Sequence, residues 1–319
     1  MSSITQAVPN FFIAGAPKAG TTSLYHWLAA HPQVYMSSIK EPSYFSLEAR
    51  PENFAPEYQE RMLQQMSDVQ SSLRSGTGQS LRHGVVGEWE DYLRLFVAAA
   101  NKIAVGEASV VYLWSKTAAQ RIAERLPHSR ILLILRDPAE RAFSQYLHYV
   151  SFGQVSTSFR QHILASLNPG DKFGLYSPFL EMGLYAEQLQ RYLDVFPREQ
   201  FRIWLYEDTV AEPEVFHRQV MEFLTIDSSF VPDVSKRHNE LLVPKLLGIT
   251  QAMRRSGLWG RLRSTMPAPL RPLLRKVAYR QRRSVHLAPE DRRFLIDYYK
   301  KNIHQLQHFL DRDLSAWLK

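Results

Sequence analysis

Residues 15–23 carry the residue types of an anion-binding loop, Gly-Ala-Pro-Lys-Ala-Gly-Thr-Thr-Ser. An apolar run precedes them and a helical composition follows, so the segment fits the end of a strand, a loop and the start of a helix. Main-chain N–H groups of such a loop and the positive end of the helix dipole attract phosphate-like oxygens, and glycines let these oxygens approach closely. The segment therefore predicts a binding site for a phosphate or sulfate group.

The place of the cation separates this loop from that of nucleoside-triphosphatases. The glycine spacing is kept, but Thr21 stands where that pattern has its lysine, and Lys18 lies three positions earlier. A lysine inside the loop could neutralise an oxygen that bridges a phosphate and a transferred group. The alternative is a phosphoryl-transferring kinase, which would need Mg²⁺ and, normally, the missing lysine.

A second anion site is predicted at the end of residues 130–135, whose continuous apolar run suits a strand buried on both faces. Arg136 follows this strand, at the edge where open α/β sheets bind ligands, and Ser144 lies about two helical turns further on. A guanidinium can hold two phosphate oxygens at once. In the alternative reading, Arg136 only pairs with Asp137 or Glu140. Two anion sites together indicate a ligand that is phosphorylated in two places.

The elements that must position these residues alternate between strand and helix, as a doubly wound α/β fold requires. Residues 71–80 are rich in Ser and Gly and are expected to form an exposed loop, and residues 225–289 show no strand pattern. The predicted strands are residues 10–14, 33–36, 103–106, 130–135 and 201–206, and the predicted helices are residues 22–30, 115–126, 138–149, 185–196, 213–224 and 295–310.

Charge is distributed unevenly over the 319 residues, whose formal net charge is +8. Residues 241–289 contain eleven Lys and Arg and no Asp or Glu. This basic segment, expected to be helical, could form a lid for an anionic glycan, a membrane-surface helix or a plain helical subdomain. Nucleic acid is not expected as a partner, since no binding motif accompanies the charge.

The chain has no cysteine, which excludes disulfides, thiolate nucleophiles and cysteine-ligated metals. The first ten residues lack the basic and apolar regions of a secretory signal, and no run of about 18 apolar residues is present. These features lead us to expect a cytoplasmic protein with one α/β domain over residues 1–319.

Taken in this order, the two anion motifs resemble those of the sulfotransferases that use 3′-phosphoadenosine 5′-phosphosulfate. The resemblance covers roughly residues 10–240 and implies a three-layer, P-loop-type α/β fold with a central parallel sheet and a helical C-terminal extension. It implies that Lys18 contacts the bridging oxygen and helps the nucleotide to leave, and that no metal is needed. The residues implied to bind the nucleotide are Lys18, Ala19, Gly20, Thr21, Thr22, Ser23, Arg136, Ser144 and Tyr206, with Lys236 and Arg237 as the nearest match to a late basic loop.

Sulfuryl transfer also needs a base for the acceptor proton. The segment Lys40-Glu41-Pro42 resembles the glycan-modifying branch of this family, whose glutamate serves as the base, so Glu41 is our first candidate. Because Pro42 follows it, Glu41 is expected to be extended. Glu107, after the third strand, is the alternative base. The expected acceptor is a carbohydrate or another hydroxylated small molecule; the remaining alternative is a non-catalytic protein that binds a nucleotide or a membrane surface.

Overall fold

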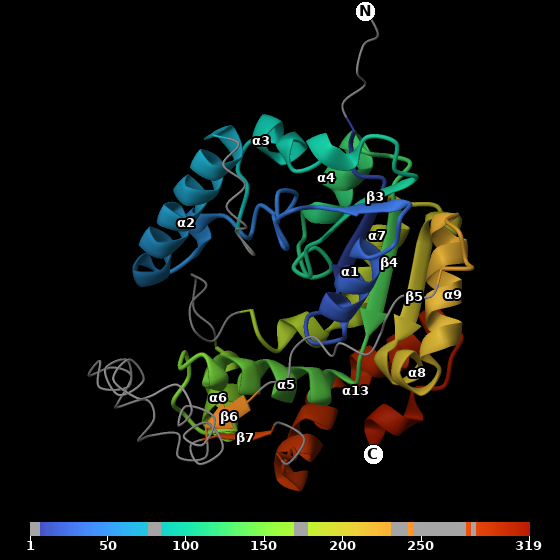
Figure 1. The fold of residues 1–319 in the computed structure, drawn as a ribbon. Helices are drawn as coiled ribbons and strands as arrows, with labels where there is room; N and C mark the ends of the chain where they lie inside the picture. The colour runs from blue at the N-terminus through green and yellow to red at the C-terminus, as the bar shows by residue number, and fades with distance from the viewer. Residues whose placement is uncertain (1–6, 76–83, 169–177, 231–241, 245–278, 282–284) are drawn as a thin grey trace, which may run out of the picture.

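A five-stranded parallel sheet forms the centre of the molecule in a computed structural model that describes residues 7–75, 84–168, 178–230, 242–244, 279–281 and 285–319 (Figure 1). Its order is β2-β3-β1-β4-β5. The strands are β1 (Phe11–Gly15), β2 (Val34–Met36), β3 (Ala104–Ala108), β4 (Arg130–Leu135) and β5 (Phe201–Leu205). All five predicted strands are therefore present, with ends displaced by at most two residues.

Burial explains why the central strands are so apolar. All five residues of β1 are buried, and β4 is buried from Ile131 to Leu135, as expected of a strand with helices on both of its faces. One continuous hydrophobic core extends from Phe11 to Trp317. The three-layer α/β fold with a central parallel sheet is thereby confirmed.

Six helices follow the prediction closely. The helix α1 packs against β1, β2 and β3, while α7 packs against α4 and α13. The bounds are α1 (Thr21–Ala29), α4 (Ala118–Arg125), α5 (Pro138–Ser151), α7 (Tyr185–Leu193), α9 (Pro213–Leu224) and α13 (Pro289–Leu310). The last of these is the expected helical C-terminal extension, and it also contacts α5.

Several elements differ from the prediction. Residues 71–75, expected in a loop, belong to the helix α2 (Pro56–Ser75), because Gln, Met and Leu favour a helix and Val69 is buried on its inner side. The short helices α3 (Trp89–Arg94), α6 (Phe159–Ser166) and α8 (Tyr206–Ala211) were also not predicted. Tyr206 thus begins a helix rather than ending a strand.

The expectation that residues 225–289 contain no strand is wrong, since β6 (Leu242–Pro244) and β7 (Tyr279–Gln281) pair as antiparallel strands. This pairing joins residues 35 positions or more apart, which a local pattern cannot indicate. Residues 245–278 and 282–284 of the basic segment lie outside the described residues. In the part of the chain that the structure describes, no helix is both long and apolar enough to cross a bilayer.

Candidate active site

The loop between β1 and α1 has the shape of an anion-binding loop. Gly15 is required there, because a Cβ on it would lie 2.7 Å from Cβ of Leu113. Gly20 precedes α1 with φ of 94°, a conformation that favours glycine, and Lys18 also has a positive φ, 65°. No side chain caps α1 and no acidic residue lies in its first turn. The N–H groups of Thr21 and Thr22, the first two of this helix, are therefore left without a side-chain cap and could face an anion.

Side chains of the helix start differ in their exposure. Thr21 is 3 % exposed, Thr22 is half-buried and Ser23 is exposed, and Ala19 is fully buried in the loop. The backbone N–H of Ser23 is already bonded to the carbonyl of Gly20, at 2.9 Å. Residues 19–23 thus surround the start of α1, where the sequence predicted the phosphosulfate group.

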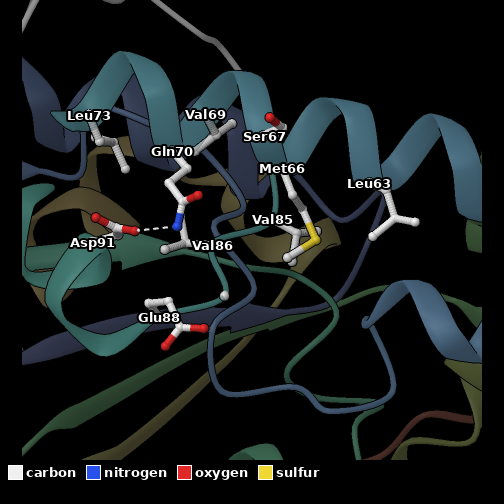
Figure 2. A pocket seen from close by; sticks show the side chains of 11 residues that line it. Leu63, Met66, Ser67, Val69, Gln70, Leu73, Val85, Val86, Glu88 and Asp91 are labelled. Atoms are coloured by element: carbon white, nitrogen blue, oxygen red, sulfur yellow. Dashed lines mark hydrogen bonds between the residues drawn. The ribbon is translucent and has the colours of Figure 1, made fainter. Parts of the chain in front are cut away.

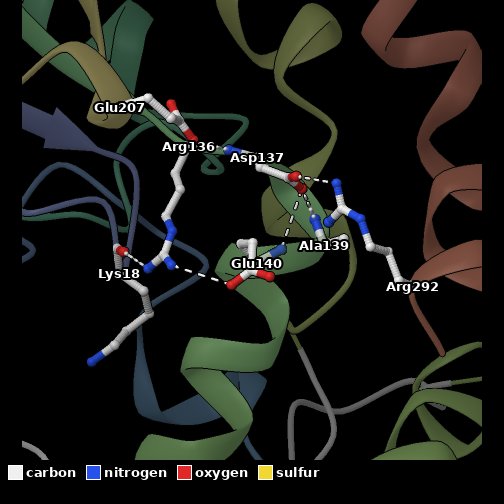
Figure 3. A network of polar contacts seen from close by, with 7 residues as sticks. All are labelled: Lys18, Arg136, Asp137, Ala139, Glu140, Glu207 and Arg292. Atoms are coloured by element: carbon white, nitrogen blue, oxygen red, sulfur yellow. Dashed lines mark hydrogen bonds and ion pairs between the residues drawn. The ribbon is translucent and has the colours of Figure 1, made fainter. Parts of the chain in front are cut away.

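Arg136 brings the two predicted anion sites together. In the sheet, Leu135 of β4 is in register with Leu205 of β5, so Arg136 and Tyr206 leave neighbouring strands side by side. Arg136 donates from Nη1 to the carbonyl of Lys18 at 3.1 Å (Figure 3). Its guanidinium lies 4.7 Å from the centre of the Tyr206 ring. The loop between β1 and α1, which we call the nucleotide loop after its predicted ligand, is therefore fixed relative to the end of β4.

The predicted alternative partner of Arg136 is also present. Nη2 of Arg136 lies 3.4 Å from a carboxylate oxygen of Glu140, in the first turn of α5 (Figure 3). Arg136 is 8 % exposed, whereas the Glu140 side chain is 38 % exposed. The ion pair does not exclude an anion site at Arg136. The Glu140 carboxylate contacts the guanidinium from one side and is exposed, so a phosphate could displace it.

Asp137 organises the start of α5. Its Oδ1 accepts hydrogen bonds from the N–H groups of Ala139, at 2.9 Å, and Glu140, at 3.3 Å, while its own N–H donates to Glu207 at 3.2 Å. Its Oδ2 accepts from Arg292 of α13, at 2.9 Å (Figure 3). No sequence motif marks Arg292, so only the structure could find it.

Tyr206 lies beside this loop, whereas Ser144 is placed only by its position on α5. A Cβ on Gly20 would lie 3.4 Å from the Tyr206 ring, so this ring packs against the nucleotide loop. Ser144 is 3 % exposed on α5, two turns beyond Arg136. Lys236 and Arg237 lie outside the described residues. Nor do the described ranges contain a group of three or more His, Asp or Glu residues able to hold a metal.

Glu41 follows β2 in a tight loop. Its carboxylate lies 2.6 Å from Nζ of the buried Lys40, and 35 % of its side chain is exposed. The expected extended backbone is wrong: φ of Glu41 is 61°. Two local bonds account for this, because the N–H of Glu41 donates to Ala108 at 2.9 Å and its carbonyl accepts from the Ser43 hydroxyl at 3.2 Å.

Glu107 is fully buried in β3. Its carboxylate accepts hydrogen bonds from the hydroxyls of Tyr92, at 2.8 Å, Ser109, at 2.6 Å, and Tyr112, at 2.7 Å. Burial raises the pKa of Glu107 to about 7, with the nearby negative charge of Glu41 adding to the effect of desolvation. The two candidate bases therefore differ: Glu41 is accessible, and Glu107 lies beneath it with its oxygens occupied by protein hydroxyls.

A separate cavity of about 240 Å³ lies under α2 (Figure 2). Apolar side chains such as Met66 and Val86 line it, and Gln70 donates across it to Asp91 at 3.0 Å. Neither the nucleotide loop nor Arg136 contributes to its wall. This cavity is thus distinct from the site around Arg136.

The sequence is similar to proteins of the sulfotransferase family. A family model described as "Sulfotransferase family" matches residues 9–230. Carbohydrate sulfotransferase 15 of Mus musculus is 29 % identical over 272 residues, covering 69 % of this chain and 44 % of the relative. Bifunctional heparan sulfate N-deacetylase/N-sulfotransferase 2 of Bos taurus is 28 % identical over 225 residues, covering 69 % and 22 %. The chain thus spans less than half the length of these curated relatives.

One solved structure is similar to this chain over most of its length. The sulfotransferase from Alicyclobacillus acidocaldarius is 29 % identical, with a TM-score of 0.70, over 98 % of this chain and all of the other.

Proposed function

Because the chain belongs to the sulfotransferase family, we propose that it transfers a sulfuryl group from 3′-phosphoadenosine 5′-phosphosulfate to a carbohydrate hydroxyl or amine. The observation that carries this proposal is the 3.1 Å bond from Arg136 to the Lys18 carbonyl. It fixes the two predicted anion sites next to each other, which supports a ligand that carries phosphates at both its 3′ and 5′ positions. The rival kinase lacks comparable support, since Thr21 replaces its lysine and no relative reported above is a kinase.

The donor fits the residues present. The open N-terminus of α1, with Thr21, Thr22 and Ser23, would hold the 5′-phosphosulfate, and Arg136 with Ser144 would hold the 3′-phosphate. Lys236 and Arg237 are further proposed ligands of this phosphate. Arg136 would exchange Glu140 for the phosphate, which binds a guanidinium in the same bidentate way as a carboxylate.

Lys18 and Glu41 are the proposed catalytic residues. The donor supplies an activated sulfate whose leaving group is a nucleotide phosphate. The ammonium of Lys18 would neutralise the charge that develops on the bridging oxygen, and the exposed carboxylate of Glu41 would take the acceptor proton. Lys40 pairs with Glu41 at 2.6 Å and so restrains the position of its carboxylate.

A carbohydrate acceptor is supported by the two relatives, a carbohydrate sulfotransferase and a bifunctional heparan sulfate N-deacetylase/N-sulfotransferase. Such glycans are anionic, and the eleven Lys and Arg of residues 241–289 would complement them. We propose that this basic segment covers the acceptor. A peripheral membrane contact through the same segment is the alternative that a vesicle-binding measurement would detect.

Calorimetric titration with 3′,5′-adenosine bisphosphate, in the absence of metal, tests the donor site. Wild type should bind, and Arg136→Ala should lose at least tenfold in affinity, about the 1.4 kcal/mol expected for a charged hydrogen bond. Arg202→Ala, an exposed arginine on β5, serves as the control and should bind as wild type does. No binding by folded wild type, together with binding of ATP and Mg²⁺, would reject the sulfotransferase in favour of the kinase.

Transfer itself is tested with labelled donor and N-desulfated heparan sulfate or chondroitin as acceptor. Glu41→Gln should lower kcat by roughly 10²–10⁴-fold, the usual contribution of a general base. Donor affinity should stay within twofold, since Glu41 does not belong to the nucleotide loop. Unchanged kcat in this variant would remove Glu41 from the mechanism while leaving the family assignment in place.

A further inference from the structure

Glu107 belongs to a buried hydrogen-bond network that the proposed mechanism does not use. It is 0 % exposed, and so are all three residues whose hydroxyls donate to it, Tyr92, Ser109 and Tyr112. An acceptor sugar cannot reach this carboxylate. A buried carboxylate with three donors is instead suited to fixing the direction of each hydroxyl.

Two of these hydroxyls continue toward the loop that carries Glu41. Ser109 Oγ accepts the N–H of Ser43 at 3.0 Å, and Tyr112 Oη accepts the N–H of Phe45 at 3.3 Å. Because Ser109 and Tyr112 donate their hydrogens to Glu107, their lone pairs are left for these two amides. The carboxylate thereby holds the hydrogen of each hydroxyl on its own side, so that a lone pair of each oxygen can face the amide.

The Glu41 loop needs such support. Glu41 and Ser43 have φ of 61° and 52°, a region that residues other than glycine seldom adopt. The N–H of Glu41 donates to Ala108, the residue that follows Glu107 in β3. The loop is thus attached to β3 and its neighbours at Glu41, Ser43 and Phe45, on both sides of Pro42.

We propose that Glu107 is a positioning residue: through Ser109 and Tyr112 it holds the backbone of Ser43 and Phe45, and so places the carboxylate of Glu41 for the acceptor. The inference rests on the proposed role of Glu41 as the base. It replaces the reading of Glu107 as an alternative base. A displacement of a reacting group by about 1 Å costs up to about 100-fold in rate, so such support is expected to matter for kcat.

The first test measures hydrogen exchange at the amides of Ser43 and Phe45 in the full chain, and needs no acceptor. Ser109→Ala removes the hydroxyl that bonds Ser43, whereas Ser115→Ala removes an equally buried hydroxyl that donates to Glu48 instead. Exchange at Ser43 should be at least tenfold faster in Ser109→Ala than in Ser115→Ala. Equal rates in the two variants would overturn the proposal.

The second test is kinetic. Ser109→Ala should lower kcat about tenfold or more, with the KM for donor within twofold, and Ser109→Thr, which keeps the hydroxyl, should restore most of it. The double variant Ser109→Ala/Glu41→Gln should be no slower than Glu41→Gln alone, because both changes act through the same carboxylate. Additive losses would mean that Ser109 affects kcat independently of Glu41, and would contradict the proposal.

Glu107→Gln examines the carboxylate itself. In this variant an amide nitrogen replaces one carboxylate oxygen, and this nitrogen donates hydrogen bonds but cannot accept them. At least one of the three hydroxyls must therefore turn its hydrogen away from residue 107. Exchange at Ser43 or Phe45 should rise accordingly. If Glu41→Gln leaves kcat unchanged, the proposed base fails, yet faster exchange in Ser109→Ala and Glu107→Gln would still establish the support of the loop. The two failures are therefore distinguishable.

Discussion

Arg292 lies 2.9 Å from Asp137, although 155 positions separate them in the chain. The bond joins α13 to the residue that caps α5 and follows Arg136. Only 8 % of the Asp137 side chain and 23 % of that of Arg292 are exposed. A residue from the end of the chain thus neutralises a carboxylate directly beside the predicted phosphate site (Figure 3).

Replacement of Arg292 by alanine should weaken nucleotide binding. The unpaired charge of Asp137 would repel a 3′-phosphate on the neighbouring Arg136, and the cap of α5 would lose its orientation. We expect the Kd for 3′,5′-adenosine bisphosphate to rise about three- to tenfold, corresponding to roughly 1 kcal/mol for a partly buried pair. Arg293→Ala, an exposed neighbour on the same helix, is the calorimetric control; equal affinities in the two variants would contradict this role.

Removal of the Glu140 charge should have the opposite effect. This carboxylate accepts from Arg136 at 3.4 Å, so a phosphate must compete with it. In Glu140→Gln the nucleotide should bind about two- to fivefold more tightly, the scale of a half-exposed ion pair. Glu187→Gln changes an equally placed acid in the first turn of α7 and should leave binding unchanged. Weaker binding in Glu140→Gln would show that Glu140 orients Arg136 rather than competing for it.

The sequence alone predicted the five parallel strands and both anion motifs, because each rests on local signals. The run of residues 130–135 has no polar residue after Arg130, and the glycines of residues 15–20 permit the positive φ that such a loop needs at Gly20. The burial of Glu107 was not foreseeable, since Tyr92 and Tyr112 approach it from separate elements. Nor was the backbone of Glu41: Pro42 favours an extended residue before it, but bonds to Ala108 and Ser43 outweigh that preference.

The free energy of unfolding should depend on pH through the titration of Glu107. Burial raises the pKa of this carboxyl from 4.5 to about 7, so between these values the folded protein keeps a proton that the unfolded chain has released. Stability should then fall as pH rises through this window, by at most about 3 kcal/mol. Urea unfolding at pH 5 and pH 8 measures the change.

Glu107→Gln isolates this contribution. Glutamine does not titrate, while all other groups, including the buried His162, contribute to both proteins alike. The free energy of unfolding of wild type, relative to the variant, should therefore be larger at pH 5 than at pH 8. Parallel stability curves would mean that Glu107 is already ionised in the folded protein at pH 5.

Gly20 should be sensitive to any side chain. Its φ of 94° would strain an alanine by about 1–2 kcal/mol, and the new Cβ would meet the Tyr206 ring at 3.4 Å. Gly20→Ala is expected to weaken binding of 3′,5′-adenosine bisphosphate about tenfold. Gly153→Ala, with φ of 73° at the far end of α5, should suffer similar strain in thermal unfolding but bind normally. Normal binding by folded Gly20→Ala would argue against a nucleotide at this helix start.

Lys18 and Glu41 share a backbone conformation that suits glycine better than lysine or glutamate, with φ of 65° and 61°. Glycine at either position would relieve strain and could make the protein more stable by up to about 1 kcal/mol. The more stable variant would then be the one that lacks the two proposed catalytic side chains. Selection for thermal stability alone would therefore favour the loss of both side chains. Engineering of this protein should screen for stability and for sulfuryl transfer together.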